Sequence, residues 1–211
     1  MLNLDRPIGL AAERIVALVD LDDEANAPTF FSVLLLASAG ALLGVIARHR
    51  RASGEPGASH WAMLSILFIG LSFDEAASIH ETMIGPFRRM FPDNRFVYFG
   101  WVVPGAIFVL LVGALFLRFL LTLDRRTRNL FVASGVIFIG GALGIEVVEG
   151  YIASGRGEDN WPYVIALTVQ EVMEMVGVIV FIYALLEHLR NLTAGIDLHW
   201  PQPGREPDSS A

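Results

Sequence analysis

Five long apolar runs dominate the pattern of hydrophobic and polar positions along the chain. A helix needs about 20 apolar residues to cross the hydrocarbon core of a bilayer, and each run is close to that length or longer. The pattern therefore predicts an all-α integral membrane helical bundle with five transmembrane helices. The runs are Thr29–Ala47, Trp61–Met83, Phe96–Leu121, Leu130–Tyr151 and Pro162–Leu186.

The two ends of the chain differ from these runs. Apolar residues recur at helical spacing over Arg6–Val19, which predicts a short N-terminal interfacial helix. This stretch lacks a charged n-region followed by a small-residue cleavage site, so we expect no removable signal peptide. The end of the chain is rich in Pro, Gly and Ser, which is typical of disorder. We therefore predict an interfacial segment over 1–28, a five-span transmembrane domain over 29–190 and a disordered tail over 191–211.

Composition and charge narrow the class of protein. The chain has 211 residues, of which 54% are hydrophobic, and a mean hydropathy of +0.55, which is too apolar for an ordinary soluble domain. It has no cysteine, which excludes disulfides, iron–sulfur clusters and thiolate metal sites. Its net charge is −7 and no basic face is visible, so we expect it to contact the lipid bilayer and no nucleic acid.

The distribution of arginine predicts the orientation. Eight arginines flank the ends of runs one, three and five that we place in the cytoplasm, against six on the other side. Positive residues concentrate on the cytoplasmic side of membrane proteins. We therefore expect the N-terminus outside and the C-terminus in the cytoplasm.

Acidic side chains interrupt three of the five runs. No Lys or Arg lies inside these runs, and an unpaired charge at membrane depth costs several kcal/mol, so such acids are protonated, bind a cation or line water. Because the runs alternate in direction, all of the acids are expected in one layer. The candidate site residues are Asp74, His80 and Glu81 in the second run, Glu146 and Glu149 in the fourth, and Glu171 and Glu174 in the fifth.

Helical spacing indicates which of these side chains can meet. Glu146 and Glu149, like Glu171 and Glu174, are three residues apart, so each pair occupies one stripe of its helix. In the second run, Asp74 and Glu81 share a face, whereas Glu75 and His80 fall to either side of it. Not all four can point inward without a local distortion. We predict that Asp74 and Glu81 are central, that His80 reaches in from the flank, and that Glu75 is the least secure.

The residues Asp74-Glu-Ala-Ala-Ser-Ile-His-Glu81 and Glu171-Val-Met-Glu-Met175 also carry a resemblance. The chain resembles a group of uncharacterised bacterial multi-pass membrane proteins with Asp-Glu-Ala-Ala-x-x-His-Glu and Glu-x-x-Glu-Met elements. The resemblance implies a location in the bacterial inner membrane and supports these site residues, but implies no mechanism. Those proteins often read Glu-Glu in the late element, where this chain has Gln170 before Glu171.

Carboxylates combined with one imidazole suit a divalent metal ion. Iron, manganese and zinc accept oxygen together with imidazole ligands, and helical bundles build dinuclear centres from paired carboxylates on neighbouring helices. We therefore predict one or two such ions bound by Asp74, His80, Glu81, Glu146, Glu149, Glu171 and Glu174. The protein would then be a membrane metalloprotein, and an enzyme if it acts on a small lipid-soluble or interfacial substrate.

Other interpretations stay open. The same acids could form the relay of a proton- or cation-coupled transporter, or protonated bridges between helices in a structural subunit. Glu81 and Glu149 are close enough to helix ends to reach the interface instead. Trp101 and the other aromatic residues at run edges are typical of an interfacial belt. The pattern Gly40-x3-Gly44 permits close helix packing within the chain and leaves a homodimer open.

Overall fold

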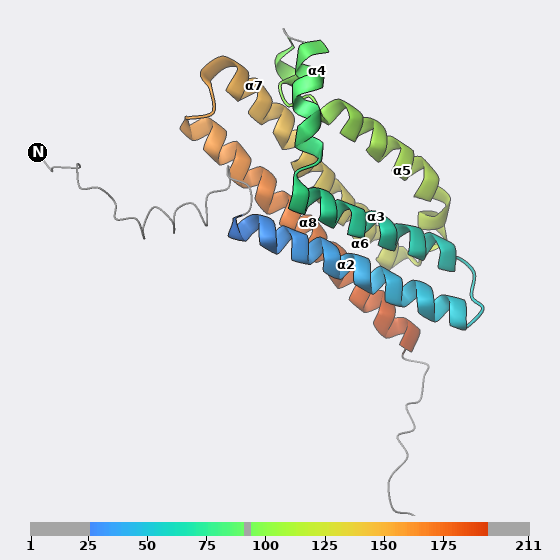
Figure 1. Ribbon diagram of the computed structural model, residues 1–211. Helices are drawn as coiled ribbons and strands as arrows, with labels where there is room; N and C mark the ends of the chain where they lie inside the picture. Colours follow the sequence, from blue (N-terminus) through green and yellow to red (C-terminus); the bar gives the residue numbers. More distant parts are fainter. Residues whose placement is uncertain (1–25, 91–93, 194–211) are drawn as a thin grey trace, which may run out of the picture.

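The computed structural model describes residues 26–90 and 94–193, and every regular element within them is helical (Figure 1). The prediction of an all-α bundle is thus confirmed. The predicted interfacial helix and most of the predicted tail lie outside the described residues. The elements are α2 (Ala27–Ala52), α3 (Ala58–Ala77), η1 (His80–Met83), α4 (Ile84–Met90), η2 (Arg95–Val97), α5 (Val102–Thr122), α6 (Arg125–Ile139), the π-helical segment η3 (Gly140–Ile145), α7 (Glu146–Arg156) and α8 (Trp161–Thr193).

Four helical segments of the described chain are long and apolar enough to cross a membrane. They are α2, α5, the continuous helix formed by α6, η3 and α7, and α8. A fifth crossing is obtained if α3 and the segment that follows it, His80–Met90, count as one bent span. The five predicted runs therefore map onto four long helices and one broken pair.

The second predicted run is not a single helix, which corrects the prediction of a continuous span over Trp61–Met83. Helix α3 ends at Ala77, Ser78 adopts a left-handed backbone conformation with φ of 47°, and the chain turns by 71° into the next segment. The backbone N–H of His80 donates to Asp74 Oδ1 over 3.0 Å. An Asp side chain that bonds to a backbone N–H competes with the helical ladder, so Asp74 stabilises the break.

The fourth predicted run is longer than expected and contains a wide turn. Between α6 and α7 the chain forms the π-helical segment η3, an irregularity that is frequent at functional sites. Gly141 in this segment lies against α8, because a Cβ atom there would be 2.9 Å from the carbonyl oxygen of Gln170. The close approach of the two helices holds Glu146 and Glu149, in the first turn of α7, beside α8.

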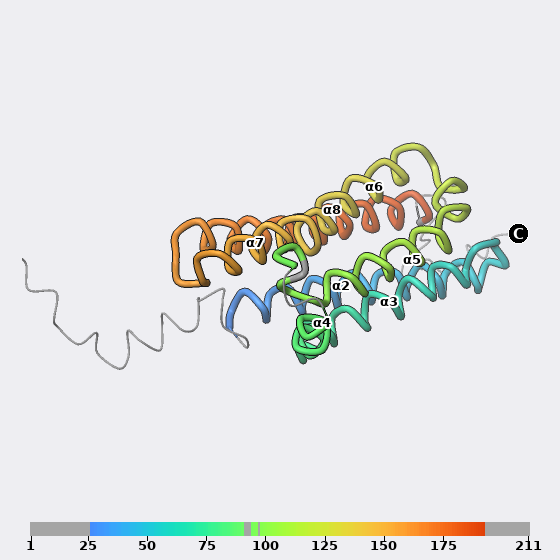
Figure 2. The backbone as a smooth tube through the Cα atoms, turned by 90° about the horizontal axis from the view of Figure 1, so that it is seen from above, coloured from blue at the N-terminus to red at the C-terminus, as the bar shows by residue number. Residues whose placement is uncertain are grey.

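The helices form two layers. Helix α2 packs along α3, the α6–α7 helix packs along α8, and α2 joins the layers by packing on α8 (Figure 2). The best-filled part of the core lies where α2 ends and α3 begins. We call this region the packed end; Leu43, Ile46, Trp61 and Leu185 are fully buried in it. Its interior is consequently filled by large side chains in direct contact.

Candidate functional site

A cavity of about 530 Å³ lies between α5 and the rest of the bundle. Side chains of α2, α3, α5, α6, η3, α7 and α8 all contribute to its wall. Over most of its length the wall is apolar, and several aromatic rings face it. These include Phe68, Phe108, Phe116, Phe131, Phe138 and Phe181. The cavity is therefore a hydrophobic chamber within the membrane-spanning part of the chain.

One end of this cavity is lined by acids. All seven candidate residues from the sequence line it, together with Glu75. Glu174 interacts electrostatically with Glu75 and Glu146, and Glu146 interacts electrostatically with Glu81. Acids of α3, η1, α7 and α8 thus line the same cavity, and we call this set of residues the carboxylate layer. It comprises Asp74, Glu75, Glu81, Glu146, Glu149, Glu171 and Glu174.

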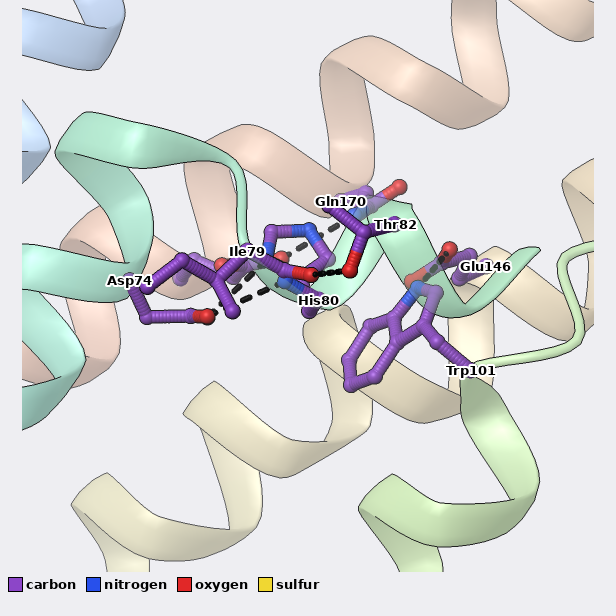
Figure 3. A network of polar contacts seen from close by, with 8 residues as sticks. Asp74, Ile79, His80, Thr82, Trp101, Glu146 and Gln170 are labelled. Carbon is purple, nitrogen blue, oxygen red and sulfur yellow. Dashed lines mark hydrogen bonds and ion pairs between the residues drawn. The ribbon is translucent and has the colours of Figure 1, made fainter. Parts of the chain in front are cut away.

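His80 is held against Asp74 at the break in the second run. Its Nδ1 lies 2.9 Å from Asp74 Oδ2, while its backbone N–H donates to the other carboxylate oxygen (Figure 3). The carboxylate of Asp74 therefore holds His80 at two points, one on its imidazole ring and one on its backbone. With Nδ1 engaged, Nε2 is the nitrogen of this ring that can bind a further group.

Trp101, at the start of α5, connects this pair to α7. Its ring centroid lies 4.8 Å from that of His80, and its indole N–H donates to Glu146 Oε1 (Figure 3). Glu146 and Glu149 are almost inaccessible to solvent, with 7% and 2% of their surface exposed. A neutral donor thus stabilises a buried carboxyl group, which removes part of the cost of burying it.

On α8, the amide of Gln170 donates to Glu174 Oε1 over 3.1 Å. The other half of the amide, Gln170 Oε1, is buried and has no hydrogen-bond partner among the described residues. A buried acceptor without a donor costs free energy, so this oxygen makes that turn of α8 less stable.

Three residues at the cavity were not in the predicted set. Glu75 was placed to the side of the inward face on the assumption of an ideal helix, but the chain bends just after this residue. Trp101 looked like part of an interfacial belt, and only the structure places its N–H beside Glu146. Gln170 stood out in the sequence only as a departure from the pattern expected from the resemblance. The aromatic and amide roles depend on contacts between helices, which spacing within one helix does not give.

The metal prediction lacks geometric support. Among the residues that the structure describes, no group of three or more His, Asp or Glu side chains is arranged to hold a metal ion. Glu146 and Glu174 each accept a hydrogen bond from a neutral donor, and Asp74 contacts the ring of His80. Binding of iron, manganese or zinc by these residues therefore stays a prediction.

Comparison with known proteins identifies a family. A family model described as a domain of unknown function, DUF8692, matches residues 1–189. The chain belongs to this family. No curated protein and no solved structure matches the chain. The family's description carries no activity, so the function is argued from the cavity and the carboxylate layer.

Proposed function

We propose that this protein binds a lipid-soluble molecule inside the bilayer, with the apolar part of the molecule in the cavity and its polar end in the carboxylate layer. The observation that carries the proposal is the division of the cavity wall. Its aromatic and aliphatic side chains fill most of the wall, and the acids of three helices meet at one end. An amphiphilic molecule matches both parts.

The size of the cavity agrees with such a ligand. Small-molecule sites in proteins measure about 300–1,000 Å³, and the cavity of about 530 Å³ falls within that range. On α5 the lining runs from Gly105 to Leu120. At a rise of about 1.5 Å per residue this stretch is about 22 Å long, whereas one leaflet of a bilayer core measures about 15 Å. A hydrocarbon chain as long as those of membrane lipids is thereby accommodated.

Helix α5 supplies one wall and is attached weakly. Of its residues only Phe119 is buried, while Leu110, Leu111 and Leu121 are widely exposed on its outer face. A lateral displacement of this helix breaks few packed contacts, so a ligand can enter from the surrounding lipid. The polar end then meets the Asp74–His80 pair, which can exchange a proton with it.

The experiment fills the cavity without touching the acids. Gly113 of α5 and Gly135 of α6 line the cavity, and a Cβ atom on either meets no atom within 4 Å. Gly113→Leu and Gly135→Leu should therefore fold and occupy space that the ligand needs. Purified protein in phosphatidylcholine vesicles is labelled with a hexadecyl probe that carries a photoreactive diazirine in its chain. We expect specific labelling of α5 and α6 peptides, reduced severalfold in both variants.

Gly70→Leu is the matched control. Gly70 lies on α3 outside the cavity lining, and a Cβ atom there also meets nothing within 4 Å. It should label like the parent protein. Equal labelling of all four proteins would overturn the proposal, because the probe would then sit on the outer surface.

Metal binding and ion-coupled transport are tested in the same preparation. Elemental analysis would support a metalloprotein if iron, manganese or zinc were present in stoichiometric amount and lost in Glu171→Gln and Glu174→Gln. Cation flux that depends on the same residues in proteoliposomes would support a carrier.

A further inference from the structure

His80 is the one basic side chain on the cavity wall among the described residues, and it lies between Asp74 and Trp101 (Figure 3). Asp74 accepts the backbone N–H of His80 over 3.0 Å and lies 2.9 Å from Nδ1 of its ring. The indole of Trp101 packs near the same ring, with 4.8 Å between the ring centroids. The orientation of the imidazole is therefore fixed by the protein before any ligand binds.

The second nitrogen of this ring, Nε2, has no hydrogen-bond partner among the described residues. The side chain of His80 is 28% exposed, so its neighbours do not enclose it completely. An ionised carboxylate only accepts hydrogen bonds, so Asp74 in that state requires the hydrogen on Nδ1. Nε2 is then an acceptor if the ring is neutral and a donor if the ring is protonated. In both cases it can make one directed hydrogen bond to a bound molecule.

Three classes of polar head group differ in how they meet this nitrogen. An ammonium group only donates, so it satisfies Nε2 only while the ring is neutral. A carboxylate or phosphate group only accepts, so it needs a protonated ring, and every ionised acid of the carboxylate layer repels it. A hydroxyl group both donates and accepts, so it bonds to Nε2 in either state of the ring. It also brings no charge to membrane depth, where an unpaired charge is costly.

We propose that the molecule bound in the cavity carries an uncharged hydroxyl head group, of the alcohol or phenol type, which forms a hydrogen bond with Nε2 of His80. The proposal rests on the proposed function and adds to it the chemical class of the ligand and the residue that recognises it. Such a molecule dissolves in the bilayer without an ionic partner, so it enters the cavity from the lipid without the cost of desolvating a charge.

Competition among long-chain probes that differ only in the head group tests the proposal. Hexadecanol, its methyl ether, hexadecylamine and hexadecanoate are added to the photolabelling reaction in phosphatidylcholine vesicles, and their partition into the vesicles is measured separately. We expect hexadecanol to displace the label at about one fifth of the ether concentration, since a hydrogen bond between neutral groups is worth about a factor of five. The two ions should compete no better than the ether.

A long-chain phenol, 4-hexadecylphenol, distinguishes the two sources of a hydroxyl group. Both it and hexadecanol should compete better than the methyl ether. The stronger of the two identifies the ligand as a phenol or an alcohol, and either order supports the proposal.

One variant and one matched control locate the effect. His80→Phe keeps an aromatic ring beside Trp101 and leaves the backbone bond to Asp74 in place, but removes Nε2. It should bring hexadecanol to the level of the ether and leave the ether unchanged. His60→Phe makes the same replacement in a residue that stacks on Phe119 and lies outside the cavity lining. It should retain the preference.

A measurement on the parent protein needs no variant to fold. Hexadecanol should shift the Nε2 nitrogen resonance of His80 in labelled protein, and the methyl ether should shift it less. An Nε2 resonance that responds equally to both would contradict the hydrogen bond.

The outcomes separate the two proposals. Equal competition by hexadecanol and its ether would overturn the hydroxyl head group, and specific labelling of α5 and α6 would leave the proposed function intact. Preference for hexadecylamine or hexadecanoate would contradict the proposal in the same way, and a preference retained in His80→Phe would overturn the role of Nε2. Failure of every probe to displace a specific label would overturn the proposed function itself.

Discussion

The two ends of the bundle use the same helices for opposite purposes. At the packed end, Trp61 of α3 is 1% exposed and stacks on His188 of α8, with Phe119 and Phe131 at its edges. Toward the other end, side chains of α3 and α8 line a cavity of about 530 Å³. Both regions are apolar in sequence. The difference shows that hydropathy predicts where a chain meets lipid, but not where its interior is filled.

Polar groups follow the same division. At the packed end they are of both signs, although only the side chains of His188 and Glu187 are buried: Arg50 lies 3.4 Å from His188 and 3.1 Å from Glu55, and Glu187 pairs with the exposed Arg126. In the carboxylate layer the acids share one sign, with His80 as the single basic group on the cavity wall described. Arg50 Nε, His60 Nδ1 and Glu187 Oε2 lack a hydrogen-bond partner among the described residues, so the two ends differ in the sign of their charged groups. Sites that bind or react are commonly less stable than the scaffold that supports them.

Truncating one aromatic residue at each end of the bundle should give the largest difference in stability. Trp61→Ala should lower the free energy of unfolding by about 3–5 kcal/mol, because it removes a fully buried ring from a filled core. Phe108→Ala should cost much less, since Phe108 borders the cavity and is 46% exposed. Thermal melting in one detergent measures both. Equal losses would contradict the division into a packed and an open region.

Two glycines make the same comparison on a smaller scale. A Cβ atom at Gly177 of α8 would lie 2.8 Å from the backbone nitrogen of Phe138 on α6, so Gly177→Ala should destabilise by about 1–3 kcal/mol. Gly113→Ala, where the space is open, should stabilise by up to about 1 kcal/mol by restricting the unfolded chain. The signs of the two shifts in melting temperature check the account. A loss of stability at Gly113 would mean that α5 packs closely on its neighbours.

The break after α3 should respond to the residue at its turn. Ser78 has a φ of 47°, a conformation that costs a side chain about 1–2 kcal/mol and that β-branched residues resist most. Ser78→Gly should therefore be neutral or stabilising, whereas Ser78→Val should destabilise and move His80 away from Asp74. The nitrogen chemical shifts of His80 in labelled protein report that contact. If Ser78→Val left both stability and shifts unchanged, the bend would not depend on this residue.

The smallest effect concerns the N-terminus of α6. Asp124 accepts hydrogen bonds from the backbone N–H groups of Thr127 and Arg126, at 2.9 Å and 3.1 Å. Hydrogen bonds from Thr127 hold the pKa of Asp124 below its usual range. Asp124→Ala should cost about 0.5–1 kcal/mol.

This cap should also respond to pH. Because the folded pKa of Asp124 is lowered, its contribution is complete above about pH 5 and is lost as pH falls below about 4, through the folded pKa. Melting of parent and Asp124→Ala proteins should therefore converge in acid. A constant difference between them across this range would contradict the capping role.

Much of the fold followed from the sequence, because apolar length and helical spacing are local properties. The helical runs were predicted from their apolar length, and the place of Glu146 and Glu149 on one stripe of a helix was predicted from their spacing. That the acids act together as one site stays a prediction. The need for a distortion near His80 was also visible, since Asp74, Glu75, His80 and Glu81 cannot share one face of a straight helix. The form of that distortion was not visible in the sequence, because it depends on the hydrogen bond between Asp74 and the backbone beyond the break.

The cavity itself had no local signal. Its wall combines small residues of α5 and α6, among them Gly105, Gly113 and Gly135, with aromatic residues from several helices. Such complementarity is a property of the assembled bundle. The roles of Trp101 and Gln170 were missed for the same reason, since each acts on an acid through contacts that the sequence pattern leaves undetermined.

The central claim is that the cavity holds a ligand from the bilayer, and an experimental structure of the protein in lipid nanodiscs tests it most directly. The account predicts elongated density between α5 and the α6–α8 wall, with its polar end beside His80, Glu146 and Glu174. Density should be absent in the Gly113→Leu variant. A structure in which α5 packs directly on α6 and α8, or in which the acids face lipid, would contradict the account.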